Sequence, residues 1–266
     1  MLEIERFPLI ARFFWRMGRG VADLGEISIL VANVFKKIFT KPFEKKVFFA
    51  QLMEIGNRSL PVVSLTSLFT GMVLALQTII GMKRFGGEMY VGSVVGISLT
   101  KELIPVLTGL MIAGRVGSAM AAEIGTMKVT EQIDALFTLG ADPIKYLVVP
   151  RFLSAIIMVP ILTAYGDAIG LIGGKFVSVQ LMGINPVLFD EFLLLYTEWW
   201  DVTSGLIKSI FFGGIIAIIG CYKGLKTEGG AEGVGKSTTS AVVVSSILIL
   251  IADFFIAKIL PFSMKR

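Results

Sequence analysis

Residues 60–82 read LPVVSLTSLFTGMVLALQTIIGM and contain no charged side chain. A helix needs about 20 mainly apolar residues to cross a lipid bilayer, so this stretch predicts a membrane-spanning helix. Four more stretches meet the same requirement, at residues 89–118, 147–174, 205–222 and 239–260. The sequence therefore predicts an all-α integral membrane protein with about five transmembrane helices.

The composition agrees with this prediction and excludes several classes of protein. Hydrophobic residues make up 55% of the chain and charged residues 17%, whereas a typical soluble domain has about 25% charged residues. The net charge is +5, and because the basic side chains lie beside apolar runs, they favour anionic lipid headgroups over nucleic acid. The absence of histidine excludes histidine triads and imidazole metal sites, so we expect no metal site. Cys221 is the single cysteine, which excludes an intrachain disulfide.

Residues 1–46 precede the predicted transmembrane domain of residues 47–266 and follow a different pattern. Apolar residues recur there at spacings of three, four or seven, on one helical face: Phe14, Met17, Val21, Leu24, Val31, Phe35 and Ile38. Another face carries Arg12, Arg16 and Arg19. The pattern predicts an amphipathic helix in the membrane interface, and the alternative is a soluble helix packed on a partner.

The basic residues also predict an orientation. Ten of them precede the first span, which places the N-terminus in the cytoplasm. Five spans then place the C-terminus in the periplasm, although Lys265 and Arg266 at that end run against the rule. The connections at residues 119–146 and 223–238 fall on the cytoplasmic side.

Residues 230–237 read GAEGVGKS and match the phosphate-binding pattern G-x-x-x-x-G-K-[ST]. A working phosphate loop joins a buried strand to a helix, whereas this segment lies between the fourth and fifth spans. Asp253, which resembles a magnesium-holding residue, lies most of a membrane thickness from Lys236 if the fifth span is helical. We therefore expect a cytoplasmic connection in which residues 237–240 cap the last helix, and no bound nucleotide.

The second span ends in a run of small residues that includes Gly114, Gly117 and Ser118. Small residues let helix backbones approach closely in a membrane, so we expect a packing face here. Arg115 and Glu123 are eight residues apart and share a helical face. Charges at a membrane boundary need partners, so these two either join an ion-pair network or Arg115 extends to the lipid headgroups.

A short helix is predicted between Thr130, which can cap it, and Gly140, which can end it. Its first turn carries polar and acidic residues, namely Glu131, Gln132 and Asp134. Its apolar stripe consists of Ile133, Leu136 and Phe137. An apolar stripe in a cytoplasmic segment favours a partner that accepts a helix in a groove, and the alternative is a plain interhelical loop.

Residues 102–136, which read ELIPVLTGLMIAGRVGSAMAAEIGTMKVTEQIDAL, resemble the signature of MlaE-type permeases. These are the membrane subunits of MCE-associated lipid ABC transporters. The resemblance extends to SLPVVSLTSLFTGMVLALQ at residues 59–77 and GVGKSTTSAVVVSSILILIADF at residues 233–254. It also accounts for the glycine-rich match to a phosphate loop, because the family has a connection rich in Gly and Thr at that place.

The resemblance implies a homodimeric, non-catalytic permease in the bacterial inner membrane that is bound to two cytoplasmic ATPase subunits. Residues 131–136 would dock in a groove of the ATPase, which would bind ATP and Mg²⁺, while this chain would bind no cofactor. A ring of MCE-domain proteins would lie outside the membrane, and some members add a STAS-domain protein. The implied substrate is phospholipid, moved between the inner and outer membranes.

The resemblance also places four residues at the central lipid cavity of the dimer: Leu74, Gln77, Met82 and Phe85. Lys101 and Glu102 lie in the second span, where ionisable groups are costly. Neighbouring residues on a helix point apart, so each should have another partner or face water. We expect this pair to face lipid headgroups at the mouth of the cavity.

An alternative function is a secondary transporter or channel driven by an ion gradient, with Asp167, Asp253 and Glu102 as ion or proton sites. A membrane-embedded enzyme is a third class. The absence of histidine and of clustered carboxylates argues against it.

Overall fold

The computed structural model describes residues 9–40 and 44–260, with side chains described from Ala22 onward. This described part is helical and contains no strand. Five helical stretches are long and apolar enough to cross a membrane: Lys45–Lys83, Glu88–Val129, Ile144–Leu181, Trp199–Leu225 and Gly230–Ile259. Each overlaps one of the five predicted spans, so the prediction of an all-α, multi-pass membrane protein is confirmed.

The α-helices follow one another in a simple order. They are α1 (Leu9–Ile38), α2 (Lys45–Gly56), α3 (Leu60–Lys83), α4 (Val91–Ser98), α5 (Ile104–Ile112), α6 (Ser118–Val129), α7 (Gln132–Thr138), α8 (Val149–Phe176), α9 (Pro186–Tyr196), α10 (Trp199–Leu225) and α11 (Gly230–Ile259). A short 3₁₀ helix, η2 (Glu88–Tyr90), precedes α4. The second span thus consists of α4, α5 and α6 in series.

Four π-helical segments lie within the second and third spans: η3 (Leu99–Leu103), η4 (Ala113–Gly117), η5 (Ile144–Val148) and η6 (Val177–Leu181). Pro105 and Pro150 account for two of them. A proline ring clashes with the carbonyl four residues earlier, which falls inside η3 and η5 respectively, and a widened turn relieves that clash. Such segments are frequent at functional sites, and η3 carries Lys101 and Glu102.

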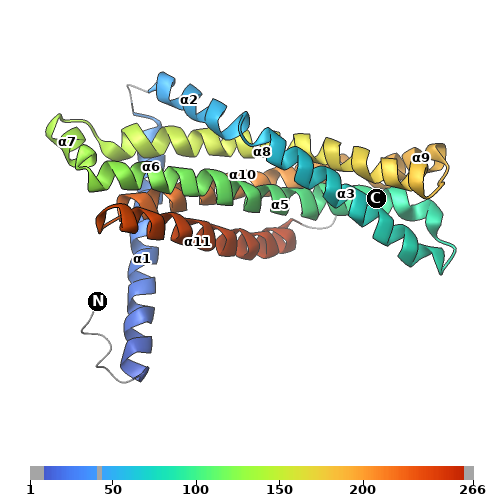
Figure 1. The fold of residues 1–266 in the computed structure, drawn as a ribbon, viewed down its shortest axis with the longest axis horizontal. Helices are drawn as coiled ribbons and strands as arrows, with labels where there is room; N and C mark the ends of the chain where they lie inside the picture. Colours follow the sequence, from blue (N-terminus) through green and yellow to red (C-terminus); the bar gives the residue numbers. More distant parts are fainter. Residues whose placement is uncertain (1–8, 41–43, 261–266) are drawn as a thin grey trace.

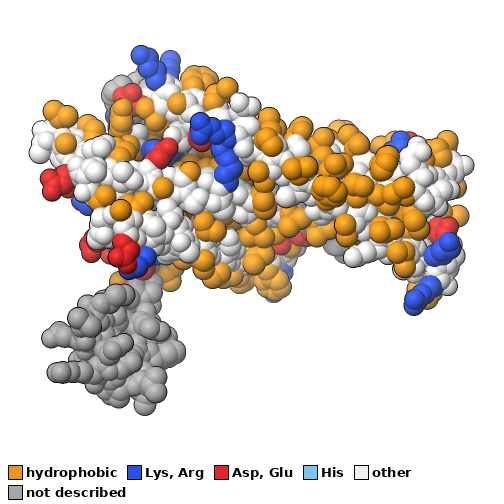
Figure 2. All heavy atoms as spheres, viewed as in Figure 1, with side chains coloured by type: hydrophobic (Ala, Val, Ile, Leu, Met, Phe, Trp, Pro, Cys, Tyr) orange, Lys and Arg blue, Asp and Glu red, His pale blue; other side chains and the backbone are white. Residues whose placement is uncertain are grey.

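The spans lie along the long axis of the molecule (Figure 1), and α8 packs against both α3 and α10. Glycines set the closest approach, since a Cβ added to Gly71 would lie 1.9 Å from the carbonyl oxygen of Gly170. Figure 2 shows hydrophobic side chains along the length of this bundle and charged side chains gathered toward its ends. This distribution is the one expected of a bundle that spans a bilayer.

Helix α1 runs across the direction of the spans (Figure 1), as expected of a helix in the membrane plane. Its predicted apolar face is confirmed only in part. Val31 and Ile38 pack against the core, whereas Leu24 and Phe35 are more than half exposed. Of the predicted residues, Phe14, Met17, Val21, Arg12, Arg16 and Arg19 lie outside the described side chains.

One expectation about the connections is wrong. The connection at residues 223–238 is largely helical, because α11 begins at Gly230, so residues 237–240 lie inside the helix and do not cap it. Gly229 precedes the helix with a φ of 84°, a left-handed conformation that glycine adopts without strain. The connection between the third and fourth spans contains the whole of α9, which begins with a capping hydrogen bond from the backbone N–H of Val187 to the side chain of Asn185.

Candidate functional site

A buried lysine joins three spans in the interior of the bundle. Lys208 of α10 is 1% exposed, and its Nζ lies 2.5 Å from a carboxylate oxygen of Glu102 in η3. The same Nζ lies 2.9 Å from Asp253 of α11. A buried cation needs compensating charge and hydrogen bonds, and two carboxylates from different helices supply them here. The contact therefore fixes the relative positions of η3, α10 and α11.

Lys101 finds a different partner in the same region. Its Nζ donates to Asp201 Oδ1 over 3.1 Å, and Asp201 Oδ2 accepts a hydrogen bond from the backbone of Glu198. Asp201 therefore also caps the beginning of α10. The expectation that Lys101 and Glu102 have separate partners is confirmed. These ion pairs make up what we call the membrane ion-pair network, in which two cations face three carboxylates: Lys101, Lys208, Glu102, Asp201 and Asp253.

Glu102 is the accessible member of this network. Its side chain is 43% exposed, whereas Lys208 is buried. Because Glu102 is held by an ion pair and is still partly exposed, it can interact with a polar group of another molecule. Sequence reasoning did not single out Lys208 or Asp201, although an isolated lysine in a predicted span is itself a signal of function.

The four predicted cavity residues lie on α3 and just beyond its end. Leu74 packs against a hydrophobic core that includes Ala75 and Ile79. Gln77 is exposed, Met82 is half-buried and Phe85, beyond the end of α3, is 89% exposed. Their assignment to a lipid cavity stays a prediction.

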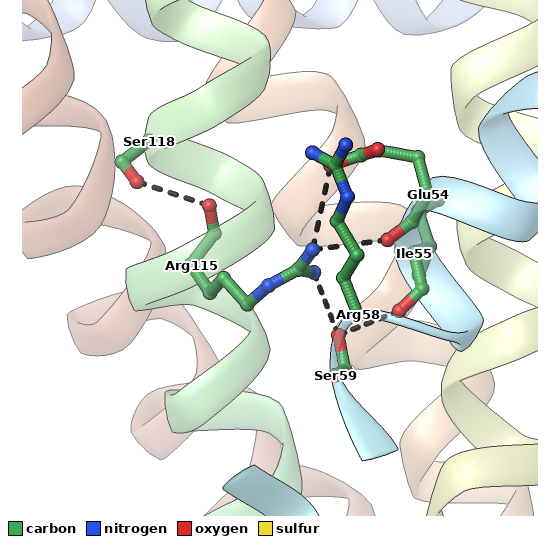
Figure 3. Close-up of polar contacts among 6 residues, drawn as sticks. All are labelled: Glu54, Ile55, Arg58, Ser59, Arg115 and Ser118. Atoms are coloured by element: carbon green, nitrogen blue, oxygen red, sulfur yellow. Dashed lines mark hydrogen bonds and ion pairs between the residues drawn. The ribbon is translucent and has the colours of Figure 1, made fainter. Parts of the chain in front are cut away.

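Arg115 of η4 binds the junction of α2 and α3 (Figure 3). Its guanidinium donates to Ser59 Oγ over 2.8 Å and to the backbone carbonyl of Glu54 over 3.1 Å, and it lies 3.4 Å from the Glu54 carboxylate. The carbonyls at the end of a helix carry partial negative charge, so a cation there is favourable. Arg58 makes a second ion pair with Glu54.

Arg115 and Glu123 do not pair with each other, although they share a helical face. Glu123 accepts from Arg151 of α8 over 2.6 Å, and Arg151 also donates to the carbonyl of Leu147. Each charge of the predicted pair therefore bonds to another helix. The prediction of an ion-pair network is confirmed, with partners on other helices. The alternative, in which Arg115 extends to the lipid headgroups, is wrong, because its guanidinium binds Ser59 and Glu54.

Of the glycines in the predicted packing face, Gly117 packs against another helix of this chain and Gly114 does not. A Cβ on Gly117 would lie 3.4 Å from Ile216, and Gly220 of α10 approaches the carbonyl of Gly117. Gly114, in contrast, is exposed and has nothing within 4 Å of the corresponding position. The difference arises because the two glycines lie on different sides of η4, and only one of these sides faces α10.

The short helix predicted between the second and third spans exists as α7, but its three apolar residues do not share one environment. Ile133 is 3% exposed and belongs to the hydrophobic core of this chain. Leu136 is partly buried against the same core, whereas Phe137 is 65% exposed and Leu139, just beyond α7, is exposed as well. The prediction that all three stripe residues face a partner is therefore wrong for Ile133.

The beginning of α7 also differs from the expectation. Thr130 does not cap it, because its hydroxyl donates to the carbonyl of Thr126 in the preceding helix. Glu131 takes the N-cap position with a φ of 61°, the one non-glycine residue with a left-handed backbone in the described part of the chain. Asp134 binds Lys128 of α6 over 3.1 Å, while Glu131 and Gln132 are exposed.

The segment that matches a phosphate loop is part of α11. Lys236 makes an ion pair with Glu232 one helical turn earlier, and both side chains are largely exposed. Gly233 is needed for a different reason, since a Cβ there would lie 1.7 Å from the carbonyl of Glu228. Asp253 binds Lys208 instead of lying near Lys236. Gly229 and Gly233 therefore serve the turn into α11.

The structure also shows the surroundings of the three carboxylates that an ion-gradient transporter would use: Glu102, Asp167 and Asp253. Glu102 and Asp253 share Lys208. Asp167 is buried on α8, and neither of its carboxylate oxygens accepts a hydrogen bond from a described residue. No group of His, Cys, Asp and Glu that could hold a metal ion occurs among the residues that the structure describes.

Comparison with known proteins gives a consistent family assignment. Residues 48–259 match the family described as Permease MlaE. A probable ABC transporter permease protein of Rickettsia conorii is 50% identical over 89% of this chain and 92% of its own length. The intermembrane phospholipid transport system permease protein MlaE of Haemophilus influenzae is 35% identical over 95% of this chain and 98% of its own length. The chloroplastic protein TRIGALACTOSYLDIACYLGLYCEROL 1 of Arabidopsis thaliana is 38% identical over 93% of this chain and 69% of its own length.

Proposed function

Because this chain belongs to the MlaE permease family and is thus the permease of an ABC transporter, we propose that it moves phospholipids between the inner and outer membranes of a bacterial envelope. The relative from Haemophilus influenzae, named for intermembrane phospholipid transport, supports this substrate. The ion-gradient alternative has no support in these comparisons.

The observation that carries the proposal is the half-exposed Glu102 bound to the buried Lys208. A phospholipid has a charged headgroup and two apolar chains, so its path through a bundle needs an apolar wall with a few charged groups. The membrane ion-pair network supplies such charges at a depth where they are otherwise costly. Leu74, Met82 and Phe85 contribute the apolar wall of a cavity between two copies of the chain, and Gln77 adds one hydrogen-bonding group to it.

Energy comes from a separate cytoplasmic ATPase, which binds ATP and Mg²⁺, while this chain binds neither. The exposed side chains Phe137 and Leu139 form the contact with that ATPase. Helix α7 follows α6 after a two-residue turn, and its buried Ile133 packs into the core. A movement of the ATPase is therefore passed to α6 and α8 and from them to the cavity.

The complex contains further partners in this proposal. The permease is a homodimer in the inner membrane, with its N-terminus in the cytoplasm and its C-terminus in the periplasm. MCE-domain proteins form a ring on the periplasmic side, and a STAS-domain protein joins the ATPase in some complexes.

The proposal is tested with the permease and its ATPase reconstituted in liposomes that contain a fluorescent phospholipid. We expect Glu102→Gln to slow ATP-dependent lipid movement because the variant loses a charge that faces the substrate. Assembly with the ATPase should persist. The matched control is Glu191→Gln, which neutralises an exposed carboxylate on α9. If the wild-type complex moves no phospholipid with ATP present, the proposed substrate is wrong.

A further inference from the structure

A second apolar space lies away from the proposed cavity, between α1 and the bundle. It has a volume of about 520 Å³ and is lined only by apolar side chains and a glycine. Ile27, Val31 and Phe35 line it from α1. We call it the α1 groove. None of the six residues assigned to the lipid cavity lines it, so it is a separate feature of the molecule.

Charged contacts hold α1 over this groove on either side of the groove residues. On one side, the hydroxyl of Tyr222 donates to Asp23 over 2.9 Å and Lys226 makes ion pairs with Asp23 and Glu26. On the other side, Lys37 makes an ion pair with Asp142, which follows α7. The three groove residues of α1 lie between these contacts and are spaced by four, so they face one side.

The wall formed by α10 has the depth of one leaflet. It extends from Ile210 to Ile219, which corresponds to ~14 Å at about 1.5 Å per residue. The hydrocarbon core of a bilayer is about 30 Å thick, so this wall covers roughly half of it. Phe152 of α8 forms part of the floor and contacts Phe35 edge to face at 5.7 Å between ring centroids.

A space lined by apolar side chains excludes water. An acyl chain is apolar and can occupy such a space. A single row of methylene groups can enter beneath α1, whereas a helix of roughly 10 Å diameter would have to displace α1 from its ion pairs. Lys36 follows Phe35, is exposed, and has no carboxylate within ion-pair distance among the described residues. Its ammonium group is thus available to a lipid phosphate at the level of α1.

We propose that the α1 groove holds one acyl chain of a phospholipid from the cytoplasmic leaflet as a resident lipid, with its phosphate beside Lys36. This lipid fills the space between α1 and the spans and is not the transported substrate. The proposal does not depend on the direction of transport or on transport itself.

The first test fills the groove. A Cβ on Gly214 would make an ordinary contact with Phe152 at 3.5 Å, so the backbone tolerates a side chain there, and Gly214→Leu extends into the groove. The control Gly25→Leu places the same side chain on α1 where nothing lies within 4 Å. Native mass spectrometry of the purified complex in mild detergent counts the retained phospholipids.

We expect wild type and Gly25→Leu to retain one more phospholipid per permease chain than Gly214→Leu. Equal lipid counts in all three proteins would overturn the proposal. Dissociation of Gly214→Leu into smaller assemblies with an unchanged lipid count would also overturn it, because that result assigns the groove to a second copy of the chain.

A second measurement avoids any loss of folding in the variant. A phosphatidylglycerol with a photoreactive acyl chain is incorporated with wild-type protein, which is then washed with detergent before illumination. We expect cross-links in the peptides that contain Ile27 to Phe35 or Ile210 to Ile219. Cross-links confined to other spans after the wash would contradict a resident lipid in the groove.

Discussion

Replacing Lys208 with methionine removes the cation that Glu102 and Asp253 share within the spans. Methionine has a similar length, so little packing is lost, but two carboxylates are left without their partner. Removing one member of a buried ion pair costs about 3–5 kcal/mol, and we expect a loss of stability of that order. Thermal unfolding of the purified protein in detergent measures the change.

The control for this prediction removes the charges of both carboxylates together with that of Lys208. The triple variant Lys208→Met, Glu102→Gln and Asp253→Asn has no uncompensated charge, so it should recover much of the stability that the single variant loses. A single variant as stable as wild type would mean that solvent compensates the two carboxylates, and that the network does not hold the three helices together.

At the scale of one element, one side of α7 packs against the core of this chain and the other side is exposed. Phe137→Asp combined with Leu139→Asp places two charges on the proposed ATPase contact, where a buried and unpaired charge costs several kcal/mol. We expect this variant to insert in the membrane and to lose the ATPase in a pull-down. The control Leu194→Asp alters a similarly exposed leucine on α9. Retention of the ATPase at wild-type levels would disprove the assigned contact.

Ile133→Asp should behave differently from the exposed pair. Ile133 belongs to the core of this chain, so a charge there opposes folding of the permease itself. We expect lower yield and a lower unfolding temperature in the isolated permease, before any ATPase is added. A normal unfolding temperature combined with loss of the ATPase would return Ile133 to the partner surface that the sequence predicted.

The contact of α1 with α10 should depend on pH. Burial raises the pKa of Asp23, but hydrogen bonds from Tyr222 and Lys226 outweigh it, so this pKa lies below its ordinary value of 3.8. The hydrogen bond from Lys226 lowers the pKa of Glu26 from 4.5. Carboxylates with lowered pKa values stabilise the folded contact above their unfolded pKa values, and this contribution is lost as the pH falls through the folded values.

We therefore expect the contact of α1 with α10 to be stable at neutral pH and to weaken once the pH falls below 3.8 and through the lowered pKa values of the two carboxylates. Spin labels on exposed positions of the two helices report the distance between them. In Lys226→Met the contact should be weaker at neutral pH and should change less with acidification. If the distance in the wild-type protein does not depend on pH, apolar packing alone holds α1 against α10 near Asp23 and Glu26.

At the scale of the whole molecule, the bundle depends on close contact between α3 and α8. Gly71→Val would place its Cβ 1.9 Å from the carbonyl oxygen of Gly170, so the two helices must separate. We expect a lower unfolding temperature, because the packing between helices that drives association in a membrane is lost. Gly81→Val, also on α3, has nothing within 4 Å and should unfold like wild type.

The sequence alone determined the fold class and the number of spans. Whether some 20 residues can cross a bilayer depends on their own side chains, so 60–82 and the four other stretches could be recognised without knowledge of their neighbours. The short helix α7 was also predictable, because its apolar spacing and Gly140 are local signals. The helical start of α11 was not, since residues 230–237 are rich in glycine and resemble a loop.

Only the tertiary structure decided which charges meet. Glu102 and Lys208 are 106 positions apart, and Arg115 finds Ser59 at a separation of 56. Sequence reasoning saw that Lys101 and Glu102 needed partners but had no means of choosing among distant residues. It also counted Ile133 with the exposed stripe, because periodicity assigns a residue to a face but does not say what covers that face. Burial and pairing depend on how the helices pack, and that packing is a property of the whole chain.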